Sequence, residues 1–170
     1  MPEQRSIRVG ILTVSDRSAR GEREDLTQAA IREVLTRGPF EVVAYEVVPD
    51  EPAQIRRVLR LWADQMELEL ILTNGGTGLA PRDHTPEATR EVLDKEAPGL
   101  AELARLAGLK KTPLAALSRG TAGVRRRSLI INLPGSPKAA AESLSALIKV
   151  IPHAVETITG ERFEGGSEHA

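Results

Sequence analysis

The sequence contains no cysteine, which excludes disulfide bonds, zinc sites with thiolate ligands and cysteine nucleophiles. Aromatic residues are scarce, with one tryptophan, one tyrosine and two phenylalanines in 170 residues. The chain therefore offers no row of aromatic side chains on which nucleic-acid bases could stack. The formal net charge is −1, so no broad positive field attracts nucleic acid either. We expect no nucleic-acid partner.

Long hydrophobic runs are also absent. No apolar run approaches the about 20 residues that cross a bilayer, and the first ten residues, MPEQRSIRVG, lack the apolar segment of a secretory signal. We expect a cytoplasmic protein with no membrane partner. The composition, 41% hydrophobic and 28% charged, is typical of a globular domain with its own core. We predict a single domain over residues 1–160 and a flexible tail over residues 161–170.

Apolar segments of strand length alternate with segments of helical periodicity. The predicted strands are 7–15, 40–48, 68–73 and 128–133. The predicted helices are 26–37, 49–66, 85–95, 100–108 and 136–158, and residues 16–25 are a predicted loop. Strands that are apolar throughout and alternate with helices favour an α/β fold of three layers, α/β/α, with a mostly parallel central sheet.

In such sheets, ligands bind at the carboxyl ends of the strands. Polar or glycine-rich segments follow each predicted strand: SDR at 15–17, PDE at 49–51, NGGTG at 74–78 and NLPGSPK at 132–138. Because these ends meet at one edge of a parallel sheet, we expect a single site there.

The glycine loop at 74–78 carries the clearest signal. Glycine tolerates a positive φ and the close approach of other atoms, and outward-facing amides after a strand bind phosphate. The letters match neither GxGxxG nor the phosphate loop that ends in GK[ST]. Two interpretations stay open on local grounds: a phosphate cradle, and a plain turn from strand to helix.

The segment ILTNGGTGLAPRD at 71–83 resembles the signature of the molybdenum cofactor biosynthesis family. In that signature, two aliphatic residues, Ser or Thr and a variable residue precede Gly-Gly-Thr-Gly, four further residues and Asp. Six more segments resemble the family in the same order: ILTVSDR, VVPDE, RDHTPEAT, APGL, LSRGTAGVR and LIINLPGSPKA. Together they cover roughly residues 7–150, and they are most similar to the molybdopterin adenylyltransferase branch.

This resemblance implies a molybdopterin-binding-like fold. It also implies an enzyme that transfers AMP from ATP to the terminal phosphate of molybdopterin, releases pyrophosphate, uses Mg²⁺ and forms a homotrimer. A separate protein that inserts molybdenum is a further expected partner. A sister branch, in which Ser136 is common, often lacks the activity, so the alternative is a non-catalytic molybdopterin-binding or carrier protein. An unrelated nucleotide-binding domain of the same architecture is a third hypothesis.

Adenylyl transfer joins two anions, so it requires amide donors, cations and carboxylates that hold magnesium. The resemblance assigns the catalytic and magnesium-binding roles to Asp50 and Asp83. On local grounds, Asp50 also suits an N-cap for the helix that follows it. Asp83 is a candidate turn residue, but we expect Thr85 to cap the next helix with Pro86 in its first position, which leaves Asp83 for a cation.

The remaining expected substrate contacts are glycine-loop amides, cations and polar residues at strand ends. They are Ser15, Asp16, Gly75, Gly76, Thr77, Gly78, Arg82, Ser118, Arg119, Asn132, Pro134, Gly135, Ser136 and Lys138. By resemblance, Ser118 and Arg119 lie on the molybdopterin side and the glycine loop on the nucleotide side.

Three of these assignments have local arguments of their own. Arg82 suits phosphate oxygens, although an exposed loop arginine is an equal alternative. Ser136 is a predicted N-cap, which places Lys138 in a first turn, where its charge opposes the helix dipole unless an anion binds. A solvated surface lysine is the alternative. We interpret His84 as a variable loop residue, because the three histidines share no metal-binding spacing.

Overall fold

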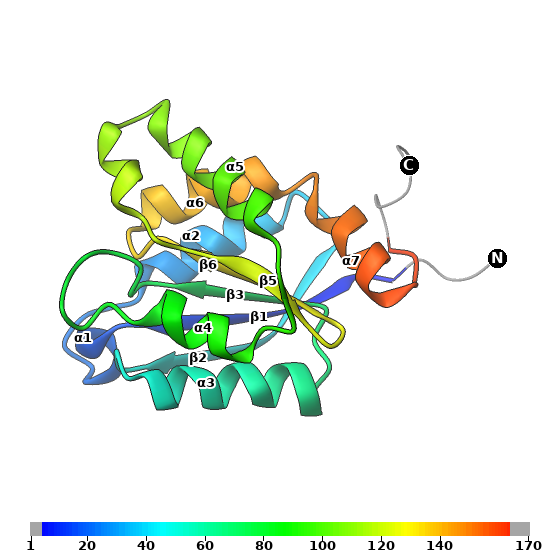
Figure 1. Ribbon diagram of the computed structural model, residues 1–170, viewed down its shortest axis with the longest axis horizontal. Coiled ribbons are helices and arrows are strands. Elements are labelled where there is room, and N and C mark those ends of the chain that lie inside the picture. Colours follow the sequence, from blue (N-terminus) through cyan, green and yellow to red (C-terminus); the bar gives the residue numbers. More distant parts are fainter. Residues whose placement is uncertain (1–4, 164–170) are drawn as a thin grey trace.

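The computed structural model describes residues 5–163, which fold around one sheet (Figure 1). In these residues the sheet has six strands in the order β2-β1-β3-β6-β5-β4. The strands are β1 Ile7–Val14, β2 Phe40–Val48, β3 Leu70–Asn74, β4 Lys95–Glu96, β5 Ala122–Arg125 and β6 Ser128–Leu133. Strands β2, β1, β3 and β6 are parallel, whereas β4 and β5 are antiparallel to their neighbours. The predicted α/β fold with a mostly parallel sheet is confirmed.

Helices cover both faces of this sheet (Figure 1). They are α1 Asp16–Ala19, α2 Leu26–Leu35, α3 Pro52–Arg60, α4 Thr85–Val92, α5 Pro98–Leu109, α6 Pro137–Leu147 and α7 Ile151–Thr159. A π-helical turn, η1 Leu61–Gln65, continues α3, and a 3-10 helix, η2 Pro113–Leu117, follows α5. Helices α2, α6 and α7 pack on one face, and α3 and α4 pack on the other.

Each parallel strand contributes to two hydrophobic cores, because successive side chains point to opposite faces. On β1, Ile11 lies in the core beneath α2 and α6, whereas Leu12 lies in the core beneath α3 and α4. On β6, Ile131 and Ile130 divide in the same way. This two-sided burial explains why these strands read as continuous apolar runs in the sequence.

Several predicted boundaries are wrong. The predicted helix 136–158 is two helices, α6 and α7, because Pro152 lacks the amide that a continuous helix needs at that position. The predicted helix 85–95 ends at Val92, where Leu93 turns to an extended conformation and leads into β4. The predicted helix 49–66 starts only at Pro52. The predicted loop 16–25 contains the short helix α1.

The flexible tail predicted over residues 161–170 does not begin at residue 161. Phe163 is buried in the core and forms a β-bridge with Arg5, so the chain is still packed at this position. Residues 164–170 lie outside the described residues. Across residues 5–163, no helix combines the length and the apolar character that crossing a membrane requires.

The loop after β3 lies next to α1, at the opposite end of the sheet from α7 (Figure 1). Both follow the carboxyl ends of parallel strands, since β1 ends at Val14 and β3 at Asn74. The loop after β6 meets the same edge, because the amide of Gly75 donates to the carbonyl of Leu133 at 3.2 Å. The segments predicted to form one site therefore converge.

Candidate functional site

A polar cavity of about 370 Å³ opens at this edge of the sheet. Its lining includes seven of the residues predicted from the sequence: Ser15, Asp50, Gly75, Gly76, Asp83, Gly135 and Ser136. They come from the loops after β1, β2, β3 and β6. The cavity is lined by four acidic residues, because Glu24 and Asp25 also line it.

The loops after β1 and β2 are held together by two aspartates. The amide of Asp16 donates to Asp50 Oδ2 at 2.9 Å, and the amide of Asp50 donates to Asp16 Oδ1 at 3.0 Å. Asp50 does not cap α3, since Glu51 is the N-cap residue and makes no side-chain cap hydrogen bond. The capping alternative for Asp50 is therefore wrong. Within residues 5–163, Oδ1 of Asp50 has no hydrogen-bond partner.

The carboxylate of Asp16 forms an ion pair with Arg82. The guanidinium of Arg82 donates to Oδ2 of Asp16 at 2.7 Å and to Oδ1 at 3.0 Å. This fork, together with the amide of Asp50, lowers the pKa of Asp16 to about 2. The predicted phosphate ligand Arg82 therefore binds a carboxylate in this structure, and Asp16 holds loops together.

Asp50 has the opposite electrostatic environment. Burial raises the pKa of its carboxyl group, and the charges of Asp16 and Asp83 raise it further against the lowering effect of the Asp16 amide. A carboxylate that is half-buried and repelled by two other carboxylates is stabilised by a nearby cation.

Asp83 has a turn role as well as a place in the cavity. Its Oδ2 accepts a hydrogen bond from the amide of Ala80 at 2.9 Å. The N-cap of α4 is His84, without a side-chain hydrogen bond, and Thr85 is already helical. The prediction that Thr85 caps α4 is thus wrong. As in Asp50, one carboxylate oxygen of Asp83 has no partner in the part of the chain that the structure describes.

These two acids fit a magnesium ion. Magnesium binds oxygen ligands, and it typically takes one or two carboxylates and completes its shell with water and substrate phosphates. Asp50 and Asp83 each offer an oxygen, and the charge of Asp83 contributes to the raised pKa of Asp50. In residues 5–163 no group of three or more Asp, Glu, His or Cys residues is arranged to hold a metal. The pair would therefore supply only part of the coordination shell.

The glycine loop serves both interpretations left open by the sequence. Gly75 and Gly76 have φ values of +93° and +68°, and a Cβ on Gly76 would lie 2.2 Å from Thr85 Oγ1. These glycines are thus required by the packing of the protein itself. The amides of Gly76, Thr77 and Gly78 nevertheless have no hydrogen-bond partner among the described residues, so they remain as donors for an anion.

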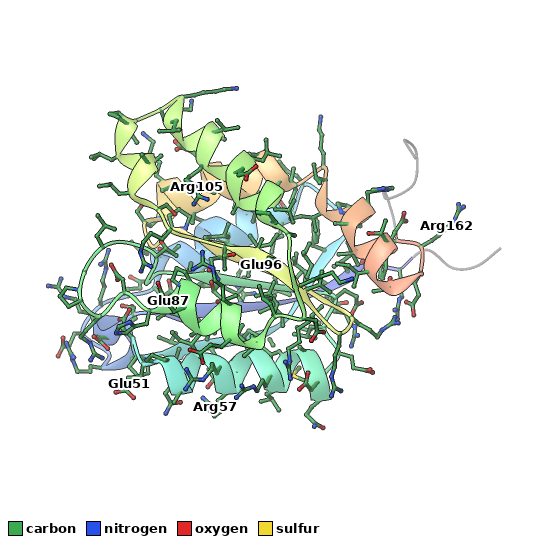
Figure 2. All side chains as sticks on the ribbon, viewed as in Figure 1. Glu51, Arg57, Glu87, Glu96, Arg105 and Arg162 are labelled. Carbon is green, nitrogen blue, oxygen red and sulfur yellow. The ribbon has the colours of Figure 1, made fainter. Side chains whose placement is uncertain are left out.

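Arg119 fixes the outer part of this loop. Its amide donates to the carbonyl of Thr77 at 2.8 Å, and its Nε donates to the carbonyl of Gly78 at 2.8 Å. Its Nη2 donates to the carbonyl of Asp83 at 2.9 Å, and its Nη1 pairs with Glu87 of α4, which Figure 2 labels. The guanidinium that was predicted to contact substrate therefore clamps the loop that carries Asp83.

Two acids of the cavity, Glu24 and Asp25, were not among the residues predicted from the sequence. Asp25 accepts three hydrogen bonds. It caps α2 through a hydrogen bond from the amide of Gln28 at 3.1 Å, and its other oxygen accepts from Thr13 Oγ1 at 2.6 Å and from the hydroxyl of Tyr45. Burial and the charge of Asp25 raise the pKa of Tyr45. Asp directly before a helical stretch is a cap signal that could have identified it.

A second cavity of about 310 Å³ lies between α5, η2 and α6. Four predicted residues line it: Ser118, Asn132, Pro134 and Ser136. Arg105 of α5 closes one side by donating to the carbonyls of Ser118 at 2.8 Å and Gly120 at 3.3 Å (Figure 2). Ser136 belongs to both cavities, so the polar cavity and this more apolar one are neighbours.

The remaining predicted residues have structural partners or lie apart. Asn132 is buried and hydrogen-bonded to Thr73, Thr89 and the amide of Thr121. Ser15 caps α1 and Ser136 caps α6, as predicted for Ser136. Six predicted residues line neither cavity: Asp16, Thr77, Gly78, Arg82, Arg119 and Lys138.

A family model described as "Probable molybdopterin binding domain" matches residues 10–153. This span contains every predicted site residue. The chain belongs to the molybdenum cofactor biosynthesis family.

Two relatives and one solved structure support this family assignment. A protein of Helicobacter pylori strain J99 named molybdopterin adenylyltransferase is 46% identical over 162 residues, which cover 94% of this chain and 92% of that protein. An Escherichia coli K12 protein of the same name is 36% identical, with 96% and 91% covered. A crystal structure of the molybdopterin biosynthesis enzyme MoaB from Thermus thermophilus is 70% identical, has a TM-score of 0.89, and covers 93% of this chain and 99% of that chain.

Proposed function

We propose that this chain is a molybdopterin adenylyltransferase that acts in molybdenum cofactor biosynthesis. An oxygen of the terminal phosphate of molybdopterin attacks the α-phosphorus of ATP. The new P–O bond forms as the bond between the α-phosphorus and the bridging oxygen breaks, and pyrophosphate leaves with that oxygen. The products are adenylylated molybdopterin and pyrophosphate. Both substrates of this reaction are soluble small molecules, and ATP is available in the cytoplasm. The reaction therefore fits the expected cytoplasmic location.

One observation carries this proposal: Asp50, Asp83 and Gly76 line the same cavity. Within residues 5–163, one oxygen of each acid and the amide of Gly76 have no hydrogen-bond partner. An anion site that contains partly buried carboxylates is a poor site for an anion alone. With a divalent cation between them, the same groups bind phosphate well. The names of the relatives at 46% and 36% identity support the same reaction.

The protein side of the mechanism is positioning and charge neutralisation. The amides of Gly76, Thr77 and Gly78 would hold phosphate oxygens of ATP, and Asp50 and Asp83 would hold magnesium. Bound magnesium supplies positive charge that offsets the charge developing on the phosphoryl oxygens. Arg82 donates to Asp16 through Nε and Nη2, so it would contact a phosphate through Nη1 or by leaving Asp16.

The second cavity suits the pterin. It is lined mainly by apolar groups such as Ala101, Ala104 and Pro134, with Ser118 and Ser136 as polar contacts. Because Ser136 lies in both cavities, a pterin bound there would extend its phosphate toward the acids and the glycine loop. Ligand sites commonly combine an apolar surface with a few placed polar groups in this way.

The test is incubation of the purified chain with molybdopterin, ATP and magnesium, followed by mass spectrometry of the pterin. We expect a product heavier by one adenylyl group, which is AMP less one water, and one pyrophosphate released for each product. The matched control is Asp83→Asn, which keeps the turn but loses a charge. Molybdopterin bound but never adenylylated, under conditions in which an established adenylyltransferase turns over, would reject the proposal.

That outcome would favour the second candidate, a non-catalytic molybdopterin-binding or carrier protein. The observation in its favour is the 70% identity to a protein named MoaB rather than adenylyltransferase, together with Ser136, which is common in that branch. Asp50 and Asp83, both present, argue for the enzyme, because a carrier needs no carboxylates beside an anion site.

We also propose that the chain assembles as a homotrimer. Helix α5 contains no fully buried residue, although it is rich in leucine and alanine. Leu103, Leu106 and Leu109 are 38%, 59% and 44% exposed on it, and Leu114 and Leu117 of η2 are exposed nearby. An apolar surface of this kind on a small domain favours contact with another protein surface, and other copies of the chain are the occupants that the family resemblance implies.

A further inference from the structure

The side chain of Thr85 stands out among the buried polar groups. Its hydroxyl oxygen is the one buried side-chain nitrogen or oxygen without a hydrogen-bond partner in residues 5–163. The residue is 0% exposed. A buried hydroxyl without a partner costs free energy, and a valine of nearly the same shape would avoid that cost. The hydroxyl therefore calls for a partner that is bound only in some states of the protein.

Neighbouring threonines show that this packing satisfies hydroxyl groups elsewhere. Thr89, one turn further along α4, donates to the carbonyl of Thr85 at 2.8 Å and accepts from Asn132 Nδ2 at 3.0 Å. Thr73 of β3 accepts from the same amide group at 2.9 Å. The missing partner is thus specific to Thr85 and not a feature of the region.

Thr85 lies beside the acid pair. Its amide donates to the carbonyl of Gly76 at 3.1 Å, which fixes the start of α4 against the glycine loop. A Cβ on Gly76 would stand 2.2 Å from Thr85 Oγ1 and 3.3 Å from Asp50 Oδ1. Both oxygens therefore face the same side of Gly76, and the absence of a side chain there leaves the space next to them clear. Oδ1 is also the Asp50 oxygen that has no partner among the described residues.

We infer that Thr85 is a positioning residue for the divalent cation: its hydroxyl donates a hydrogen bond to Asp50 Oδ1 and orients that carboxylate when a cation is bound. This inference rests on the proposed function for the presence of the cation. A carboxylate that binds a metal is itself held by hydrogen bonds from neighbouring groups, and losing such a contact typically weakens metal binding about 10–100-fold. Asp50 already accepts from the amide of Asp16 through Oδ2, so Thr85 would supply the second contact.

The experiment compares Thr85→Val, which removes only the hydroxyl, with Thr85→Ser, which keeps it. Thr89→Val is the matched control for a buried hydroxyl that has partners. For each purified variant, Mn²⁺ affinity without nucleotide is measured by electron paramagnetic resonance, and the thermal midpoint is measured in the absence of metal. We expect Thr85→Val to keep or raise the midpoint and to bind Mn²⁺ about tenfold more weakly. Thr85→Ser should bind Mn²⁺ like the parent, and Thr89→Val should lower the midpoint without changing the affinity.

Two results would overturn the inference. One is a Thr85→Val variant that binds Mn²⁺ as tightly as the parent, and the other is a parent protein that binds no Mn²⁺ at millimolar concentration. A midpoint lowered as much in Thr85→Val as in Thr89→Val, with unchanged affinity, would assign Thr85 a purely structural role. Because the readout is cation binding, failure of AMP transfer in the parent would reject the proposed function while leaving this test intact.

Discussion

Gly75 lies so close to the end of β1 that a Cβ on it would stand 2.2 Å from the carbonyl oxygen of Val14. The contact is between two backbones, so no side-chain rotation can relieve it. Gly75 also has a φ of +93°, which residues with a side chain rarely adopt. The first turn of the glycine loop is therefore fixed by β1, the strand that pairs with β3.

We predict that Gly75→Ala destabilises the protein by about 3 kcal/mol or more, because steric strain adds to the cost of a positive φ. The measurement is the free energy of unfolding in urea. Gly21→Ala is the matched control, since Gly21 has a φ of +72° but no atom within 4 Å of its Cβ position. That control should lose only about 1 kcal/mol. Equal losses in the two variants would show that the Val14 contact is not limiting.

Asp50→Asn should leave the protein as stable at neutral pH or make it more stable, while activity falls about a hundredfold. In the folded protein the pKa of Asp50 is raised above 3.8, mainly by burial. The folded state therefore holds this proton more tightly than the unfolded state, and Asp50 lowers stability progressively as pH rises above its unfolded pKa. Asparagine cannot ionise, and its side-chain oxygen can still accept from the amide of Asp16.

The check is the difference in unfolding free energy between Asp50→Asn and the parent, followed from about pH 3 to about pH 8, a window that spans the unfolded and the raised pKa. We expect the difference to grow in favour of the variant with rising pH and to level off above the raised pKa of Asp50. Asp16 does not mask this effect, because the stability that its lowered pKa contributes is complete above its unfolded pKa and is lost only toward about pH 2. A difference in unfolding free energy that is constant with pH would contradict the raised pKa of Asp50.

Asp83→Asn should retain the fold and molybdopterin binding but lose about a hundredfold in the rate of AMP transfer. The asparagine oxygen can accept the hydrogen bond that Asp83 Oδ2 takes from the amide of Ala80 at 2.9 Å, so the turn survives. The lost charge weakens magnesium binding. Single-turnover kinetics at limiting magnesium provide the measurement. Parent-like turnover would reduce Asp83 to a turn residue.

Leu106→Lys should convert the proposed trimer to monomers without unfolding them. Leu106 is 59% exposed, so its replacement costs little within one chain, whereas a charge in an apolar interface opposes association. Light scattering reports the mass against that of the 18.4 kDa chain. Leu61→Lys is the control, because Leu61 is 41% exposed in η1, beyond the opposite face of the sheet. A parent protein that is already monomeric at micromolar concentration would defeat the prediction.

Local pattern in the sequence determined the family, the mostly parallel sheet and the edge at which the candidate site residues meet. Strands such as 7–14 are buried on both faces, so their apolar character is visible in consecutive residues. The cap at Ser136 and the turn at Asp83 are likewise interactions between residues three apart, with Ala139 and Ala80. Signals of this range survive in a single sequence because both partners are close along the chain.

Tertiary structure decided which of the candidate side chains remain available. Arg82 and Arg119 have the charge that phosphate recognition needs, yet one pairs with Asp16 and the other clamps the carbonyls of Gly78 and Asp83. Two features appear only when separate loops meet: the Thr85 hydroxyl that lacks a partner within residues 5–163, and the close approach of Gly75 to Val14. Residue type fixes which hydrogen bonds and ion pairs a side chain is able to form. Which of its donors and acceptors remain available to a ligand depends on neighbours that the fold brings from distant parts of the chain.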